Sequence, residues 1–311
     1  MKNILYMVVP CYKEEEVLPE TAKRLKEKMN ALIESGKISD KSRVVLVNDG
    51  STDRTWEIIK ELHDSDKLFS GINLSRNRGH QNALLAGLMT VIDYADFTIS
   101  MDADLQDDIN AIDKMIDKYH EGCDIVYGVR SRRDTDTFFK KTTAEGFYKL
   151  MERLGAKVVF NHADYRLMSK RALEGLREFK EVNLFLRGMI PMIGYKSDIV
   201  EYERGERFAG ESKYPLKKML AFAFEGITSL SAVPIRFISV LGLIMKAIGV
   251  ILLIVALIQG AAVSGLILAS VWIVGGIQLM AIGLIGEYLG KAYLEIKGRP
   301  RFIVEEFLNG E

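Results

Sequence analysis

Two aspartates, Asp102 and Asp104, are spaced so that both carboxylates can turn toward one site, where they could bind a metal ion. They follow a short apolar run at 97–101 that is typical of a buried strand. Two neighbouring carboxylates need a counter-charge, and a hard divalent cation with oxygen ligands supplies one. We therefore expect Mg²⁺ or Mn²⁺ here, bridging the carboxylates to a diphosphate, with Gln106 as a further oxygen ligand. The alternative is an acidic pair on a solvated surface loop.

A third carboxylate, Asp49, follows another strand-like run between Asn48 and Gly50. In that position it can accept hydrogen bonds from a base or a ribose. The alternative is simple turn chemistry, because Asn-Asp-Gly favours turns and the following Ser51 can cap a helix. The sequence lacks a GxGxxG after its first strand and a GxxxxGK[ST] motif, which disfavours nicotinamide binding and P-loop hydrolysis.

Basic side chains supply the opposite charge at two places, a cluster at Arg130–Arg133 and a pair formed by Arg207 and Lys213. They can bind phosphate groups, or they can lie on solvated loops and attract anionic lipid without specificity. Overall, 42 basic residues balance 42 acidic ones, which argues against a nucleic-acid partner. Two distant cysteines, Cys11 and Cys123, exclude a disulfide framework and a cysteine zinc site, and they favour a reducing compartment.

The elements that must position these residues alternate between strand and helix over about the first 230 residues. The expected strands are 4–9, 44–47, 72–74, 97–101, 125–127 and 199–202, and the expected helices are 17–33, 55–62, 80–93 and 109–120. This alternation predicts an α/β domain with a mainly parallel sheet. Since such sheets bind ligands at the carboxyl ends of their strands, the polar clusters are expected to converge on one edge.

The C-terminal part of the chain predicts a membrane segment, because residues 247–286 contain no charged side chain. About 20 apolar residues cross a bilayer, so we expect two helices at about 237–258 and 265–287 within a hairpin of residues 235–290. Residues 215–234 predict an interfacial amphipathic helix. Lys and Arg on both flanks place the catalytic domain (1–214), the 291–311 tail and both termini in the cytoplasm, at the plasma membrane. The alternatives are a buried core hairpin and a soluble packing helix.

The motifs together resemble a known family. They are Val8-Val9-Pro10-Cys11-Tyr12, Val47-Asn48-Asp49-Gly50-Ser51, Asp102-Ala103-Asp104, Asp164-Tyr165-Arg166-Leu167, and Arg207-Phe208-Ala209-Gly210-Glu211-Ser212-Lys213-Tyr214. In this order, ahead of two membrane helices, they resemble inverting family 2 glycosyltransferases with a GT-A (Rossmann-like) fold. The resemblance covers nearly the whole chain and is most specific to enzymes that use a polyprenyl phosphate acceptor, such as undecaprenyl-phosphate glucosyltransferases and dolichol-phosphate mannose synthases.

The resemblance also implies residue roles. The residues that it implies for donor binding are Pro10, Tyr12, Glu14, Asp49 and Asp102. It implies that Asp104, and Asp164 on the acceptor side, are catalytic. The implied metal ligands are Asp102, Asp104 and Gln106. Binding of the acceptor phosphate falls to Arg130, Arg133, Arg207, Ser212 and Lys213. Lys13 and Asp108 depart from the residues common in the family and leave the donor open.

The expected reaction transfers a sugar from a nucleotide-sugar donor, UDP-glucose first, to undecaprenyl phosphate with inversion. GDP-mannose, UDP-GlcNAc, UDP-galactose and UDP-aminoarabinose remain alternative donors. A polysaccharide-building enzyme and a non-catalytic nucleotide-sugar-binding scaffold are alternative functions. A phosphate acceptor is largely dianionic at pH 7, so Asp164 can orient Arg166 or the acceptor instead of acting as a base. Glycines of the second span (Gly275, Gly276, Gly283 and Gly286) suit close helix packing in a homo-oligomer.

Overall fold

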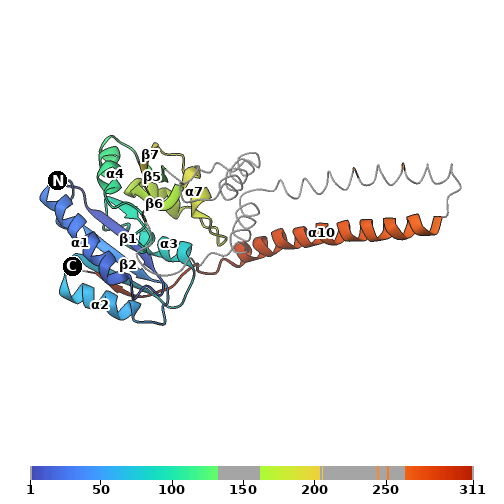
Figure 1. Ribbon diagram of the computed structural model, residues 1–311, viewed down its shortest axis with the longest axis horizontal. Helices are drawn as coiled ribbons and strands as arrows, with labels where there is room; N and C mark the ends of the chain where they lie inside the picture. Colours follow the sequence, from blue (N-terminus) through green and yellow to red (C-terminus); the bar gives the residue numbers. More distant parts are fainter. Residues whose placement is uncertain are drawn as a thin grey trace.

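The computed structural model describes residues 2–131, 162–203, 205, 244, 251 and 263–309. Its centre is an eight-stranded sheet in the order β7-β5-β6-β4-β1-β2-β3-β8 (Figure 1). The strands are β1 Leu5–Cys11, β2 Arg43–Asn48, β3 Phe69–Leu74, β4 Phe97–Ser100, β5 Ile125–Arg130, β6 His162–Ser169, β7 Ser197–Tyr202 and β8 Val304–Leu308. Strands β4, β1, β2 and β3 pair in parallel, as do β5 and β7, while β6 and β8 run antiparallel to their neighbours. The sheet is therefore mainly parallel, as predicted.

Helices cover both faces of the sheet. They are α1 Leu18–Glu34, α2 Thr55–Ser65, α3 His80–Val91, α4 Ala111–His120, α6 Lys170–Arg177 and α7 Leu186–Met192. Side chains alternate along β1, so that Leu5, Met7 and Val9 pack with α1, α2 and α4. Tyr6 and Val8 face the other way and pack with α3, α6 and α7. The result is one sheet between two apolar layers, with loops free at the strand ends.

Strand β6 was not predicted, and it explains how Asp164 reaches the site. It inserts antiparallel between β4 and β5, pairing Arg166 with both Ser100 and Tyr127. Because its direction is opposite to that of β4 and β5, its first residues lie at their carboxyl ends. The sequence around Ala163–Leu167 gave no strand signal of its own, because a charged pair interrupts the apolar pattern that a central strand normally shows.

The C-terminal residues, expected as a separate tail, include a strand of the central sheet. Strand β8 pairs antiparallel with β3 and forms the edge of the sheet, with Phe307 packed against the α3 layer. The helix before it, α10 (Val263–Lys297), extends away from the sheet in Figure 1. Part of the segment expected as a tail, 291–311, therefore belongs to the α/β domain.

Helix α10 covers the second expected span, 265–287, and continues beyond it. The interfacial helix expected at 215–234 lies outside the described residues, and so does the first span apart from residues 244 and 251. Within the part of the chain that the structure describes, no helix meets the length and apolar character that crossing a membrane requires.

Candidate functional site

The end of β2 holds the loop that follows β3. Asp49 is buried, and its two carboxylate oxygens accept the backbone N–H groups of Arg78 at 2.7 Å and Gly79 at 2.9 Å. Burial raises the pKa of Asp49 despite these hydrogen bonds. Gly50 has a φ of 59°, and a Cβ there would lie 2.4 Å from the backbone nitrogen of Asn77. Asp49 and Gly50 together fix the path of the 76–79 loop at the carboxyl edge.

The turn after β1 lies against the end of β2. Pro10 is paired with Val47 in the sheet, and Tyr12 follows with 40% of its surface exposed. The backbone N–H of Glu14 donates to Thr55 Oγ1 at 3.0 Å. The expected donor-binding residues Pro10, Tyr12, Glu14 and Asp49 are thus brought to the same sheet edge, and Tyr12 offers an accessible aromatic face.

The end of β4 presents the acidic pair. Asp102 is partly exposed and accepts a hydrogen bond from His80 Nε2 at 2.9 Å. Burial lowers the pKa of His80, but the hydrogen bond and charge of Asp102 outweigh it and raise the pKa to about 9. Asp104 accepts the backbone N–H of Gln106 at 3.2 Å. His80 is the first residue of α3, so the helix brings its ring to the metal-ligand candidates.

The donor chemistry of this loop fits a divalent cation. Next to the pair lies Asp107, which is buried and whose Oδ2 lacks a hydrogen-bond partner within the described residues. Burial and the charges of Asp102 and Asp104 raise the pKa of Asp107 to about 6. The described residues contain no group of three His, Cys, Asp or Glu side chains arranged to hold a metal ion. Mg²⁺ commonly binds through one or two carboxylates plus substrate phosphates and waters, so this loop matches that mode.

Asp164 lies between two arginines. It is buried, and Arg166 donates to its Oδ1 while Arg187 Nη2 donates to its Oδ2 at 2.9 Å. Asp164 and Arg166 share one face of β6 because they are two residues apart. Arg187 arrives from α7, and His80 Nδ1 lies 3.9 Å from the same carboxylate. Burial alone would raise the pKa of Asp164, but Arg187, Arg166 and His80 hold it well below its usual range.

Arg130, at the end of β5, is the described member of the expected acceptor-phosphate set. Its Nε donates to the Tyr202 hydroxyl at 3.4 Å, and its Nη2 lies 3.9 Å from Asp107 Oδ1. Tyr202 in turn donates to Asp107. Arg130 therefore lies beside the acidic loop. The other expected members, Arg133, Arg207, Ser212 and Lys213, lie outside the described residues.

Arg187 and Asp107 are site residues that the sequence reasoning missed. Arg187 lies in a segment without a motif, and only the packing of α7 over the sheet brings it to Asp164. Asp107 is buried and accepts a hydrogen bond from Tyr202, which lies in a strand far away in the sequence. The one available signal was the excess of acidic residues after Asp104.

The structure is thus an α/β fold with a mainly parallel sheet, and an acidic pair, a buried aspartate and paired arginines lie at the carboxyl edge, where sheets of this kind bind ligands. The chain belongs to Glycosyl transferase family 2, which matches residues 6–177, and it is a glycosyltransferase.

Relatives match over nearly the full chain. The chain is 52% identical to the "Uncharacterized glycosyltransferase YkoT" of Bacillus subtilis (strain 168), covering 99% of this chain and 93% of the relative. It is 40% identical to the "Prophage bactoprenol glucosyl transferase homolog" of Escherichia coli (strain K12), covering 96% and 97%. The solved mannosyl-3-phosphoglycerate synthase from Rubrobacter xylanophilus has a TM-score of 0.51 at 15% identity, covering 75% of this chain and 74% of that one. This last likeness supports the GT-A-type fold alone.

Proposed function

We propose that this glycosyltransferase moves a sugar from a nucleotide sugar, UDP-glucose first, to a polyprenyl phosphate such as undecaprenyl phosphate. The observation that carries the proposal is the match, at 40% identity over 96% of the chain, to a relative named for bactoprenol glucosyl transfer. The acidic loop and the paired arginines at one sheet edge supply the charges that a nucleotide diphosphate and a phosphate acceptor require.

The donor is proposed to lie across the ends of β1, β2 and β4. Tyr12 is exposed enough to contact a base, and Asp49 retains lone pairs beyond its two backbone hydrogen bonds. Asp102 and Asp104, with Gln106, would hold Mg²⁺ or Mn²⁺ against the diphosphate. When bound, that ion supplies charge stabilisation for the departing nucleotide.

The acceptor phosphate needs little help to become a nucleophile. A phosphate monoester has a second pKa near 6, so it is largely dianionic at pH 7. Asp164 is already paired with Arg166 and Arg187, and the low pKa of its carboxyl makes it a poor proton acceptor. We infer that Asp164 orients the two guanidinium groups, while the acceptor oxygen attacks the anomeric carbon and inverts its configuration. Arg130, with Arg133, Arg207, Ser212 and Lys213, is proposed to bind the acceptor phosphate.

A membrane location is proposed on sequence and surface grounds. The uncharged stretch 247–286 supports a two-helix hairpin, and α10 exposes large apolar side chains such as Met280, Leu289 and Ile296. Flanking Lys and Arg support cytoplasmic placement of the catalytic domain and both termini at the plasma membrane. Among described atoms, nothing lies within 4 Å of a Cβ built on Gly275, Gly283 or Gly286, which leaves room for the other span or a second copy.

A nucleotide-release assay with omitted components tests the proposal. Purified full-length protein should release UDP from UDP-glucose only when undecaprenyl phosphate and Mg²⁺ or Mn²⁺ are both present. Parallel reactions with GDP-mannose, UDP-GlcNAc, UDP-galactose and UDP-aminoarabinose identify the donor. Release with free sugars in place of the lipid would contradict the proposed acceptor.

A further inference from the structure

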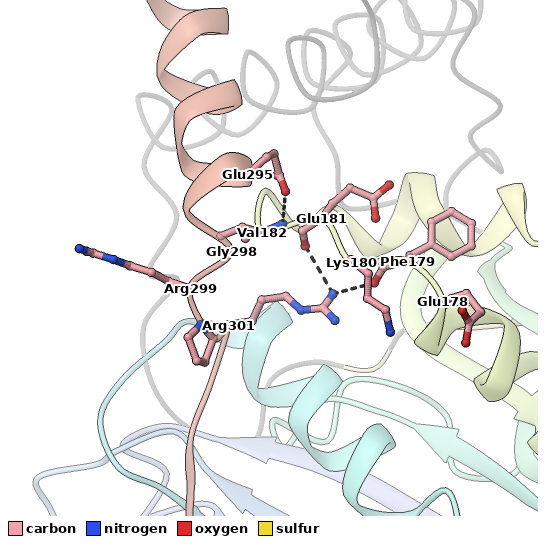
Figure 2. Close-up of a pocket in the computed structure, with 10 residues that line it drawn as sticks. Glu178, Phe179, Lys180, Glu181, Val182, Glu295, Gly298, Arg299 and Arg301 are labelled. Atoms are coloured by element: carbon pink, nitrogen blue, oxygen red, sulfur yellow. Dashed lines mark hydrogen bonds between the residues drawn. The ribbon is translucent and has the colours of Figure 1, made fainter.

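The last turns of α10 are joined to the segment that leads into α7. Glu295 accepts the backbone N–H of Val182 at 2.7 Å (Figure 2). It also accepts the backbone N–H of Asn183 at 2.8 Å. The Asn183 side-chain amide also donates to Glu295 at 2.7 Å and to the Lys291 carbonyl at 3.3 Å. We call this group of hydrogen bonds the α10 clamp. Although burial opposes it, these donors hold the pKa of Glu295 below its usual value, so the carboxylate stays charged at neutral pH.

The segment just after α10 also forms hydrogen bonds, both to the 179–181 segment and to the 76–79 loop. Arg301 Nη1 donates to the carbonyls of Phe179 at 3.2 Å and Glu181 at 3.4 Å (Figure 2). The Pro300 carbonyl accepts from Arg78, whose backbone is held by Asp49. The segment that follows α10 therefore contacts both the 76–79 loop and the segment that leads into α7.

Hydrogen bonds of Glu295 and Arg301 join the two segments across a pocket. A cavity of about 680 Å³ lies between Glu178–Val182 and the Gly298–Arg301 segment, with Glu295 on its wall (Figure 2). At the pocket itself, the described atoms that connect α10 to Val182 and Asn183 are those of the Glu295 carboxylate and the Asn183 amide. Changing Glu295 should thus loosen the backbone from Val182 onward, while Arg301 still holds Phe179 and Glu181.

That segment ends at a catalytic-site contact. Three residues after Asn183, the backbone N–H of Leu186 donates to Gln81 Oε1 at 2.8 Å, and Gln81 follows His80. The next residue, Arg187, donates to Asp164 at 2.9 Å. A shift of the 182–183 backbone is therefore transmitted through a short, hydrogen-bonded stretch to the Arg187 guanidinium.

We propose that Glu295 is a positioning residue for the transfer reaction. By holding the backbone of Val182 and Asn183, the α10 clamp sets the position of Arg187 against Asp164. The inference rests on the proposed function, and it makes the acceptor side of the site depend on the docked end of α10.

The test compares full-length variants in detergent micelles. Glu295→Gln keeps the side-chain shape but turns one acceptor oxygen into a donor that faces a backbone N–H. Asn183→Ala removes the opposite half of the clamp and serves if Glu295→Gln does not fold. Glu287→Gln is the matched control, because Glu287 lies on the same helix outside the α10 clamp and its ion pair with Lys291 is long, at 3.9 Å.

Kinetics should show a selective effect. Since a misplacement of about 1 Å can cost on the order of 100-fold, we expect kcat to fall about tenfold in Glu295→Gln and Asn183→Ala. The KM for the nucleotide sugar should stay within about twofold of wild type, and Glu287→Gln should behave as wild type. In an Arg187→Ala background, Glu295→Gln should cost less than about twofold more, because its effect passes through Arg187. A further tenfold loss in that background would overturn the proposal.

Hydrogen exchange separates this inference from the proposed function. Amides of residues 182–188 should exchange faster in Glu295→Gln than in Glu287→Gln, whether or not transfer is detected. Unchanged exchange would overturn the α10 clamp even in an active enzyme. Failure of the wild-type protein to glycosylate polyprenyl phosphate would count against the proposed function, with the exchange result still deciding the clamp.

Discussion

The ion pairs of Asp164 indicate its role in the proposed transfer reaction. Its buried carboxylate forms ion pairs with both Arg166 and Arg187, one oxygen to each guanidinium group. Two nitrogens of Arg166, Nε and Nη1, have no hydrogen-bond partner within the described residues. Buried guanidinium groups of this kind are costly unless paired, so removing the Asp164 charge should disturb the whole group.

Asp164→Asn is therefore predicted to reduce transfer by about 100-fold through lost orientation. The native pKa of Asp164 is depressed, so its stabilising charge is present above the usual carboxyl range and is lost only as pH falls through the depressed value. The wild-type-to-variant activity ratio should consequently stay constant between about pH 6 and 9. Rates measured across that range, with thermal unfolding as a folding check, test this. Recovery of the variant at high pH would show that Asp164 acts as a base.

Asp104→Ala is predicted to lower transfer by at least about 100-fold, because a metal ligand on the diphosphate is worth several kcal/mol. Asp108→Ala is the matched control, since Asp108 lies in the same loop and its carboxylate caps the backbone N–H of Asn110. Binding of Mn²⁺ in the presence of UDP, followed by electron paramagnetic resonance, provides a readout apart from rate. Unchanged Mn²⁺ binding in Asp104→Ala would remove Asp104 from the metal site.

At the scale of elements, the strands and helices of the N-terminal half were predictable because each carries a clear period. The expected strand at 44–47 and helix at 17–33 correspond to β2 and α1 with small changes at the ends. Strand β6 and the edge strand β8 were not predictable, because long-range pairing with β4, β5 and β3 determines them.

Site residues also differ in whether local sequence or long-range packing determines their position. The position of Asp49, Asp102 and Asp104 at one sheet edge was predictable, because each lies within four residues of the end of a strand and the fold class places strand ends together. Arg187 could not be found in this way, since its contact with Asp164 depends on how α7 packs. Likewise, no local pattern indicates that Tyr202 hydrogen-bonds Asp107.

Two glycines test the loop at the carboxyl edge. Gly50→Ala should destabilise the protein by about 2–4 kcal/mol, because a Cβ there meets the Asn77 nitrogen at 2.4 Å in addition to the strain of a positive φ. Gly79→Ala should cost about 1–3 kcal/mol from backbone strain alone, because Gly79 has a φ of 83° and a ψ of 156° but nothing lies within 4 Å of its Cβ. Chemical unfolding of both variants measures the difference. Equal losses would contradict the close approach at Gly50.

At the scale of the whole molecule, α10 and the sheet are parts of one continuous unit. The chain leaves α10 at Lys297 and joins the sheet edge at Val304, while Glu295 and Arg301 hold the 179–183 segment. A lipid-linked acceptor would approach from the membrane that α10 is proposed to enter. The proposed arrangement therefore places the acceptor side of the site next to the end of α10.

Cysteine labelling tests the proposed topology. A membrane-impermeant maleimide should label Ala262→Cys in intact cells and should label Asn309→Cys only after permeabilisation. Background is expected to be low because Cys11 and Cys123 are buried. Labelling of Asn309→Cys in intact cells would contradict cytoplasmic placement of the C-terminal residues.

Direct identification of the product tests the central claim. Full-length protein is incubated with UDP-glucose, undecaprenyl phosphate and Mg²⁺, and the lipid fraction is analysed by mass spectrometry and by NMR of the anomeric centre. If the proposed transfer is right, we expect a glucosyl phosphate lipid whose anomeric configuration is opposite to that of the donor. An unmodified lipid with every nucleotide sugar, or a product that retains the donor configuration, would contradict it.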